Sequence, residues 1–567
     1  MSRFLPSIAT GLMCLALASC AGQGTHEMAA PNAPAPAEEI VVTSQRADSA
    51  GGAYQTRKAN GAVRAEPAYA PPPPAPMLAM PERRPWPPAY HDVGRDTFVN
   101  KEENRFQIVR EQPVSTFSID VDTASYSFVR ASLNQNVLPQ PAAVRPEEMI
   151  NYFPYDYAAP RSVAQPFTTN VAVFPSPWTA GRKLVRIGIR GYAVQRAVRP
   201  RANLVFLIDT SGSMNEPNKL PLVKQSLSML VGQLDPNDHV AIVTYAGSAG
   251  TALEPTPVSQ KHRILEVINR LGAGGGTAGA EGVRQAYALA AANLDPAGVN
   301  RVMLATDGDF NIGITNVDEL KGFVERERNK GIFLSVLGFG MGNYNDALMQ
   351  ALAQNGNGAA AYIDTLSEAR KMLVEEAGST LFPIAKDVKI QVEFNPATVA
   401  EYRLIGYETR MLNREDFDND RVDAGDVGSG QTVTALYEIV PVGGPRAVPD
   451  LRYAPSARAP AGSASEYGFV KIRYKAPKSD RSQLIATPIN RAVEFARFEN
   501  APLDARFATG VAAFAELLRG GRYGGSLSYD DVLRIATAAR GADPFGYRGE
   551  FIQLVRTART AASMQPL

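Results

Sequence analysis

Three oxygen-bearing side chains near the middle of the chain have the types and spacing of ligands for a hard cation. Asp209 is followed at two-residue spacing by Ser211 and Ser213. One carboxylate and two hydroxyls within five residues suit Mg²⁺ or Ca²⁺ far better than a soft metal. Helix capping would also explain these residue types. Capping, however, would not require the matching residues that occur further along the chain.

The elements that must position these side chains are two apolar runs. Asn203–Ile208 leads into Asp209, and Arg301–Ala305 leads into Thr306-Asp307-Gly308. Continuous Val/Ile/Leu/Phe runs predict strands buried on both faces of a parallel sheet. Such sheets bind ligands at the carboxyl ends of their strands. Between the two runs, Gly274–Gly276 places Thr277 in a loop at the start of a helix.

The DxSxS pattern, the loop threonine and the strand-end TDG together resemble the von Willebrand factor type A domain. In that family these five positions form the metal-ion-dependent adhesion site. The resemblance implies that Ser211, Ser213 and Thr277 supply hydroxyl oxygens. It also implies that Asp209 and Asp307 bind the ion directly or through water. The expected ion is Mg²⁺, with Mn²⁺ or Ca²⁺ as alternatives.

The N-terminus has the features of an export signal. Residues 1–19 carry one early positive charge and an apolar stretch too short to span a membrane. Leu17-Ala18-Ser19-Cys20 resembles a bacterial lipobox, which implies a lipid on Cys20. Cys14 is the only other cysteine, so the folded body would contain no thiol and no disulfide. Ala21 after the cysteine favours the outer membrane, facing the periplasm. An ordinary secretory signal is the alternative.

Residues 20–95 are rich in Pro and Ala and are predicted to form a disordered tether. Within them, EEIVVTSQR (38–46) resembles the segment of TonB-dependent receptors that contacts an energy-coupling protein. A short apolar strand in a mobile arm explains the same residues without any partner.

Periodicity divides the remaining chain. Strand and helix signals alternate from residue 199 to 380, which predicts a doubly wound α/β fold with a parallel sheet. Alternating strands before and after it predict one β-sandwich-like domain into which the type A domain is inserted. From Asp480 the pattern turns helical, beginning with a helix over 488–497. The predicted segments are an N-terminal segment (96–160), a first β-rich part (161–198), the type A domain (199–380), a second β-rich part (381–478) and a helical C-terminal domain (479–567).

Sequences outside the type A domain resemble a family of bacterial lipoproteins often called YfbK-like. STFSIDVDTASY from Ser115, RPEEMINYF from Arg145 and ARGADPFGYRGEFIQLVR near the C-terminus carry this resemblance. They indicate the family but no chemistry. Asp120 and Asp122 in the first stretch are predicted to cap and form turns rather than to bind a second metal.

Composition and motifs favour a binding protein over an enzyme. The net charge of +1 gives no reason to expect a nucleic-acid partner. None of the four histidines adjoins a serine motif such as GxSxG. We therefore expect a membrane-anchored protein that binds a partner's carboxylate through the metal, in adhesion or as a scaffold. A metal-dependent hydrolase is the alternative. A helical channel is excluded because no apolar run of about 20 residues follows the signal.

The last helix of the type A domain is predicted over 367–376, leading through Phe382-Pro383 into the next strand. In related inserted type A domains, a ligand at the metal site shifts this helix. A lever of that kind and a rigid two-domain adhesin both fit the sequence.

Overall fold

The computed structural model describes residues 96–119, 122–195, 199–276, 279–308, 317–342, 344–422, 424–449 and 465–564. All of them belong to one compact unit, Arg84–Leu567. Several predicted features lie outside the described residues: Cys20, the Pro/Ala-rich arm with EEIVVTSQR, Asp120 and Thr277. Among the helices that are described, none is both long enough and apolar enough to cross a membrane.

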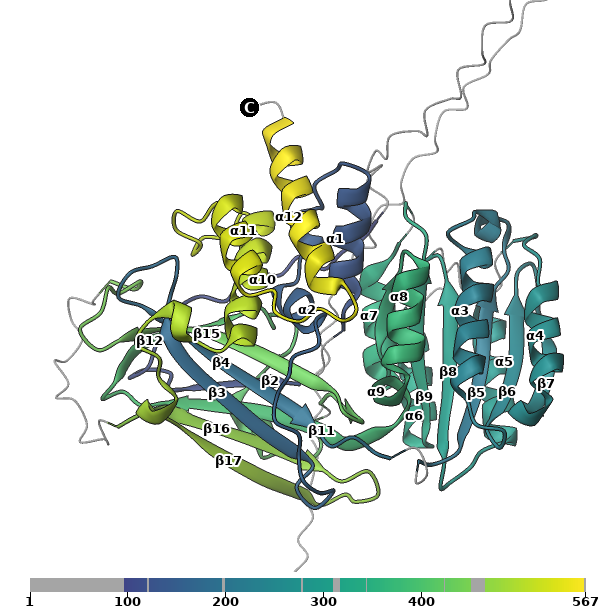
Figure 1. The fold of residues 1–567 in the computed structure, drawn as a ribbon. Helices are drawn as coiled ribbons and strands as arrows, with labels where there is room; N and C mark the ends of the chain where they lie inside the picture. The colour runs from purple at the N-terminus through teal and green to yellow at the C-terminus, as the bar shows by residue number, and fades with distance from the viewer. Residues whose placement is uncertain are drawn as a thin grey trace, which may run out of the picture. The chain divides into compact units, whose positions relative to one another are not determined.

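The type A domain has the predicted doubly wound architecture (Figure 1). Its sheet has the order β10-β9-β8-β5-β6-β7. The strands are β5 (Ala202–Asp209), β6 (His239–Tyr245), β7 (Ala249–Pro257), β8 (Val299–Thr306), β9 (Ile332–Phe339) and β10 (Ala360–Ile363). All pairs are parallel except β6 with β7, which is antiparallel. The predicted parallel sheet is confirmed, and the antiparallel edge strand β7 is an element that the sequence analysis did not predict.

Helices cover both faces of this sheet, which explains why its central strands are apolar throughout. One face packs on α3 (Leu220–Gln233), α4 (Lys261–Arg270) and α8 (Leu366–Arg370). The other packs on α5 (Gly279–Ala292), α6 (Val317–Asn329) and α7 (Asp346–Asn355). The last predicted helix is present, but its second half is π-helical. Between α8 and α9 (Ala377–Leu381) the chain forms a π-helical turn, Lys371–Glu375.

The predicted β-sandwich is present, and its two sheets share one core. One sheet has the order β1 (Gln107–Ile108), β12 (Val399–Ile405), β15 (Thr432–Pro441), β4 (Lys183–Gly191) and β3 (Phe167–Pro175). The other has the order β13 (Met411–Leu412), β2 (Val114–Ser118), β11 (Pro383–Phe394), β16 (Glu466–Lys475) and β17 (Ser482–Asn490), with β14 (Val427–Gly428) paired to β11. The type A domain lies between β4 and β11 in the sequence, so it is an insertion.

Two predictions about the flanking segments need correction. The helix expected over 488–497 is absent: residues 488–490 end the edge strand β17, which pairs with β16, and Arg491–Val493 form a short 3-10 turn. Asp122 does not cap α1 (Ala124–Asn134), because its carboxylate accepts from the Ala360 amide (2.7 Å) and pairs with Arg410 (2.9 Å). It ties the N-terminal segment to both the type A domain and the sandwich.

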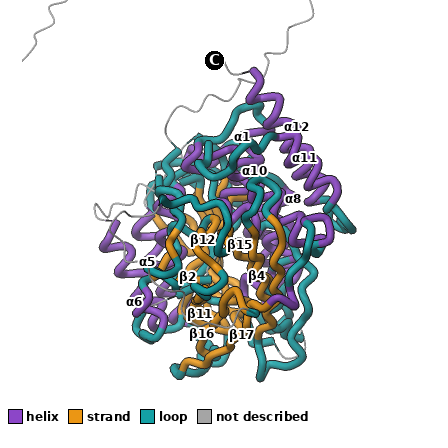
Figure 2. Tube along the Cα trace, turned by 90° about the vertical axis from the view of Figure 1, so that its left-hand side faces the viewer, coloured by secondary structure: helices purple, strands orange, loops and turns teal. Residues whose placement is uncertain are grey.

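The C-terminal helices form a separate core with part of the N-terminal segment. They are α10 (Leu503–Arg519), α11 (Tyr529–Ala538) and α12 (Tyr547–Met564). Their apolar faces pack on α1 and on α2 (Pro146–Asn151). They lie together at one end of the sandwich in both views (Figures 1 and 2). The N-terminal segment is thus shared among all three parts of the fold.

Candidate metal centre

The two predicted strands bring the candidate ligands to one edge of the sheet. β5 and β8 are parallel neighbours, with Ile208 opposite Ala305. Both strands are fully buried, so their apolar side chains fix them between the two helical layers. Because parallel strands end at the same edge, Asp209 and Asp307 emerge side by side. Both side chains are almost inaccessible, with residue exposures of 0% and 1%.

Hydrogen bonds join the serine loop to Asp209, and Asp209 to the end of β8 that leads into Asp307. Asp209 Oδ1 accepts from the Ser211 amide at 2.9 Å, and its Oδ2 accepts from Thr306 Oγ1 at 3.3 Å. The Ser211 and Ser213 hydroxyl oxygens lie 3.0 Å apart. Four of the five predicted ligands, Asp209, Ser211, Ser213 and Asp307, therefore lie in one small group at the strand ends.

The loop before Thr277 is bound to this group, although Thr277 itself lies outside the described residues. The Gly274 amide donates to the Thr210 carbonyl (2.8 Å), and the Gly212 amide donates to the Gly275 carbonyl (3.1 Å). Gly275 has φ +87°, a conformation that favours glycine. The glycine run thus holds the loop against the serine turn. The prediction that Thr277 is the fifth ligand requires this position of the loop.

Lys219 is a residue of this site that the sequence analysis missed. Its residue exposure is 4%. Its Nζ donates to Asp307 Oδ2 and to the Ser213 carbonyl, both at 3.1 Å. Gly340 makes room for it, because a Cβ there would lie 2.4 Å from Lys219 Cε. Lys219 lies six residues after Ser213 and ten after Asp209. A lysine at such a distance from candidate ligands is too common a pattern for the sequence alone to assign this role.

The charges and donor atoms fit a divalent cation. Burial raises the pKa of Asp209, and the nearby Asp307 charge also raises it, whereas the hydrogen bonds from Ser211 lower it. The ammonium of Lys219 sits between two oxygens of the site, so this position already attracts positive charge. Among the described residues, no group of three or more His, Cys, Asp and Glu could hold a metal. Serine oxygens are thus needed to complete a set of ligands, and such a set suits Mg²⁺ or Mn²⁺.

The two described histidines lie at the other edge of the sheet. His239 begins β6, opposite Asn203 at the start of β5 and far from Asp209 at its end. β7 ends beside His239, and α4, which carries His262, starts shortly after it. Neither described histidine is therefore close enough to the metal centre to act as a general base.

Sequence comparisons agree with this architecture. The family described as "von Willebrand factor type A domain" matches residues 203–376, and "von Willebrand factor" matches 92–186. "Uncharacterized protein YfbK, C-terminal" matches residues 379–561. The "Uncharacterized protein YfbK" of Escherichia coli (strain K12) is 44% identical over 465 residues, which cover 81% of this chain and 80% of that protein.

Two solved structures match this chain at lower similarity. The von Willebrand factor type A protein from Catenulispora acidiphila is 14% identical, with a TM-score of 0.40, and the match covers 71% of this chain and 91% of that one. Proximal thread matrix protein 1 from the mussel byssus, solved "with zinc occupied MIDAS motif", is 22% identical with a TM-score of 0.27, covering 32% of this chain and 46% of that one. Because this chain is 44% identical to the E. coli protein over most of both chains, it belongs to the YfbK family of proteins containing a von Willebrand factor type A domain.

Proposed function

We propose that this protein is a lipid-anchored envelope protein whose type A domain binds a partner's carboxylate through a divalent cation. Domains of this family generally mediate protein–protein interactions. The observation that carries the proposal is the grouping of Asp209, Ser211, Ser213 and Asp307 at one edge of the sheet. These residues, with Thr277, would hold Mg²⁺ or Mn²⁺.

The charge of the site supports an acidic partner. Two carboxylates and the Lys219 ammonium leave one net negative charge. A divalent cation would turn this into one net positive charge in a buried setting. An anionic group from a partner is then the favoured ligand for the outward-facing position, because electrostatic attraction is strong where water is scarce.

The anchoring half of the proposal rests on the sequence. A lipid on Cys20, which follows the lipobox-like residues, would attach the chain to the membrane, and the Pro/Ala-rich arm up to residue 95 would hold the folded body away from it. The resulting location is the cell envelope, with the protein attached to the outer membrane and facing the periplasm.

Calorimetric titration of the protein with Mg²⁺ and Mn²⁺ tests the metal site. Asp209→Ala should abolish binding without unfolding the domain, because the site lies at the rim of the sheet. Asp318→Ala is the matched control, since Asp318 is an exposed aspartate on α6 whose side chain is 84% accessible. An unchanged Mg²⁺ affinity in Asp209→Ala would refute the metal site. If an envelope partner is still captured in the presence of EDTA and by the Asp209→Ala variant, metal-dependent recognition is refuted.

A further inference from the structure

A second candidate binding site lies between the type A domain and the sandwich. It is a cavity with a volume of about 510 Å³. Its walls include Arg301 at the start of β8, Ser379 in α9, and the loop from Asp426 to Thr432 in the sandwich. The metal centre lies at the other end of β8, so the two sites are separate. Pockets of this volume hold ligands of metabolite or small-peptide size.

Arg301 is the unusual feature of this cavity. Its residue exposure is 4%, yet no carboxylate among the described residues lies within ion-pair distance of it. Its Nη1 donates to the neutral Ser335 hydroxyl (2.6 Å), and its Nε has no partner. Burial lowers its pKa to about 10. A buried guanidinium without a direct ion pair is costly, and an anion supplied by a ligand would lower that cost.

The other arginines that line the cavity differ from Arg301 because each has a carboxylate partner. Arg410 pairs with Asp122 at 2.9 Å, and Arg190 lies 3.8 Å from Asp156. Arg301 is therefore the side chain to which a ligand's anionic group would go. A guanidinium matches a carboxylate best, through two parallel hydrogen bonds.

Asp426 lines the same cavity and constrains the ligand further. Its charge acts on Arg301 without forming an ion pair with it. A carboxylate at this position disfavours a multiply charged anion such as phosphate. It favours instead a ligand whose own carboxylate is accompanied by an ammonium group, because that ligand could contact both charges.

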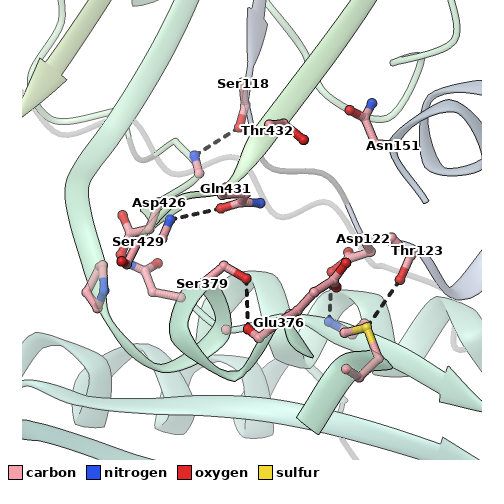
Figure 3. Close-up of a pocket in the computed structure, with 18 of the residues that line it drawn as sticks. Ser118, Asp122, Thr123, Asn151, Glu376, Ser379, Asp426, Ser429, Gln431 and Thr432 are labelled. Atoms are coloured by element: carbon pink, nitrogen blue, oxygen red, sulfur yellow. Dashed lines mark hydrogen bonds between the residues drawn. The ribbon is translucent and has the colours of Figure 1, made fainter. Parts of the chain in front are cut away.

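Neutral hydrogen-bonding side chains line the cavity beside Asp426, together with the carboxylates of Asp122 and Glu376 (Figure 3). Those two carboxylates already pair with Arg410 and Lys371. Ser429 Oγ accepts from the Val194 amide (2.8 Å), which leaves its hydroxyl proton for a ligand. Thr432 Oγ1 has no hydrogen bond within the described part of the chain. Hydroxyls of this kind can bind the amide groups of a peptide backbone.

We propose that this cavity binds a small zwitterion, an amino acid or a peptide of a few residues, with its carboxylate on Arg301 and its ammonium beside Asp426. The ligand would contact the type A domain and the sandwich at once.

The test uses trialanine as the probe, with thermal unfolding and calorimetry of the whole folded protein. EDTA is present throughout, so that the peptide carboxylate cannot bind a metal ion at Asp209. Trialanine should raise the unfolding midpoint, with a dissociation constant on the order of 0.1–1 mM for a ligand of this size. Trialanine amide, which lacks the carboxylate, should bind about tenfold more weakly or not at all. N-acetyl-trialanine, which lacks the ammonium, should also bind more weakly.

Arg301→Met should abolish the trialanine-induced shift while the ligand-free protein folds, because the substitution removes an uncompensated buried charge. Asp426→Asn is a second variant, and it should make trialanine and N-acetyl-trialanine bind equally. Arg270→Gln on α4 is the control and should change nothing, since Arg270 is exposed, pairs locally with Glu266 and does not line the cavity. The proposal is overturned if no probe binds, which would mean that the cavity holds only water. It is equally overturned if the three probes bind alike, or if Arg301→Met binds trialanine normally.

Discussion

Replacing Lys219 by Met tests the electrostatics of the metal centre most directly. The wild-type ammonium lies 3.1 Å from Asp307 Oδ2, so it neutralises one of the two carboxylates that a metal would need. Methionine keeps most of the side chain's volume beside Gly340 but removes the charge. Two effects should follow: the metal-free domain loses stability, and the affinity for Mg²⁺ rises.

The size of each effect can be worked out from the ion pair. For a divalent ion about 5 Å from the lysine ammonium, the repulsion at an effective dielectric constant near 20 is about 7 kcal/mol. Solvent at the rim of the sheet weakens this repulsion strongly, so we expect Mg²⁺ affinity to rise by about tenfold or more rather than by the full ~10⁵-fold. Losing a charged hydrogen bond to a buried carboxylate should destabilise the metal-free protein by about 2–3 kcal/mol.

The assay combines calorimetric Mg²⁺ titration with urea unfolding, each in EDTA-treated and metal-loaded protein. Lys219→Arg keeps the charge and should leave the affinity near that of the wild type. Lys224→Met is the matched control: Lys224 is also on the α3 side of the domain, but it donates to the carbonyls of Asn269 and Leu271.

A fall in Mg²⁺ affinity on Lys219→Met would refute the reasoning. Such a fall would mean that the lysine chiefly orients Asp307 and that its repulsion of the metal is small. An unchanged affinity would likewise refute it, because the charge would then not be felt at the metal position.

Three further predictions concern anchoring, stability and pH. Cys20→Ser should move the protein from the membrane fraction to the soluble fraction after a salt wash; retention in the membrane would exclude a lipid anchor at Cys20. Arg130→Met should destabilise the protein by about 3–5 kcal/mol in urea unfolding, because it leaves the buried Asp364 and Glu368 without their partner, and Glu368→Gln added to it should recover part of the loss. Burial raises the pKa of Glu147 from its ordinary value of 4.5 to about 7. Between these two pH values the folded state keeps a proton on Glu147 that the unfolded state releases. Stability should therefore fall between pH 4.5 and 7, by about 3 kcal/mol from this group, and Glu147→Gln should flatten that part of the profile.

The strands that carry the metal centre could be predicted because their burial is complete. β5 and β8 are covered on both faces, so each contains an unbroken apolar run, Leu204–Ile208 and Val302–Ala305, that ends just before the polar ligands. Parallel pairing then fixes Asp209 beside Asp307 without further information. Lys219 could not be assigned in this way. Its contact with Asp307 depends on the path of the chain between β5 and α3, and on the space left by Gly340, which no local pattern contains.

Edge strands were where prediction failed. β7 and β17 each lie at the edge of a sheet, so they are partly exposed and lack a clean alternation of apolar and polar residues. In β17, Leu484 is exposed and Pro488 interrupts the pattern, a combination that an edge strand tolerates. The strand therefore lacked the signal that identified the central strands, and its last residues were assigned to a helix.

The last helix of the type A domain bears on how binding could affect the rest of the protein. Arg130 on α1 ties it down: its Nε donates to Asp364 Oδ2 (2.8 Å) and its Nη2 to Glu368 Oε2 (2.7 Å). The same arginine reaches Glu550 of α12 at 3.2 Å, so three parts of the fold meet at one guanidinium. A shift of the helix along its axis would have to break these buried contacts or carry α1 and α12 with it.

Breaking such contacts costs about 3–5 kcal/mol, so a partner at the metal centre would have to favour the shifted arrangement by at least that much. Carrying the attached helices along costs less, and would transmit the movement to the C-terminal helices as well as to β11. The lever hypothesis therefore requires a partner that binds the shifted arrangement more favourably by this free energy, whereas a rigid adhesin requires no such difference. A disulfide engineered between α8 and the sheet separates them: partner affinity that is equal in the oxidised and reduced protein, with the crosslink confirmed, would leave only the rigid arrangement.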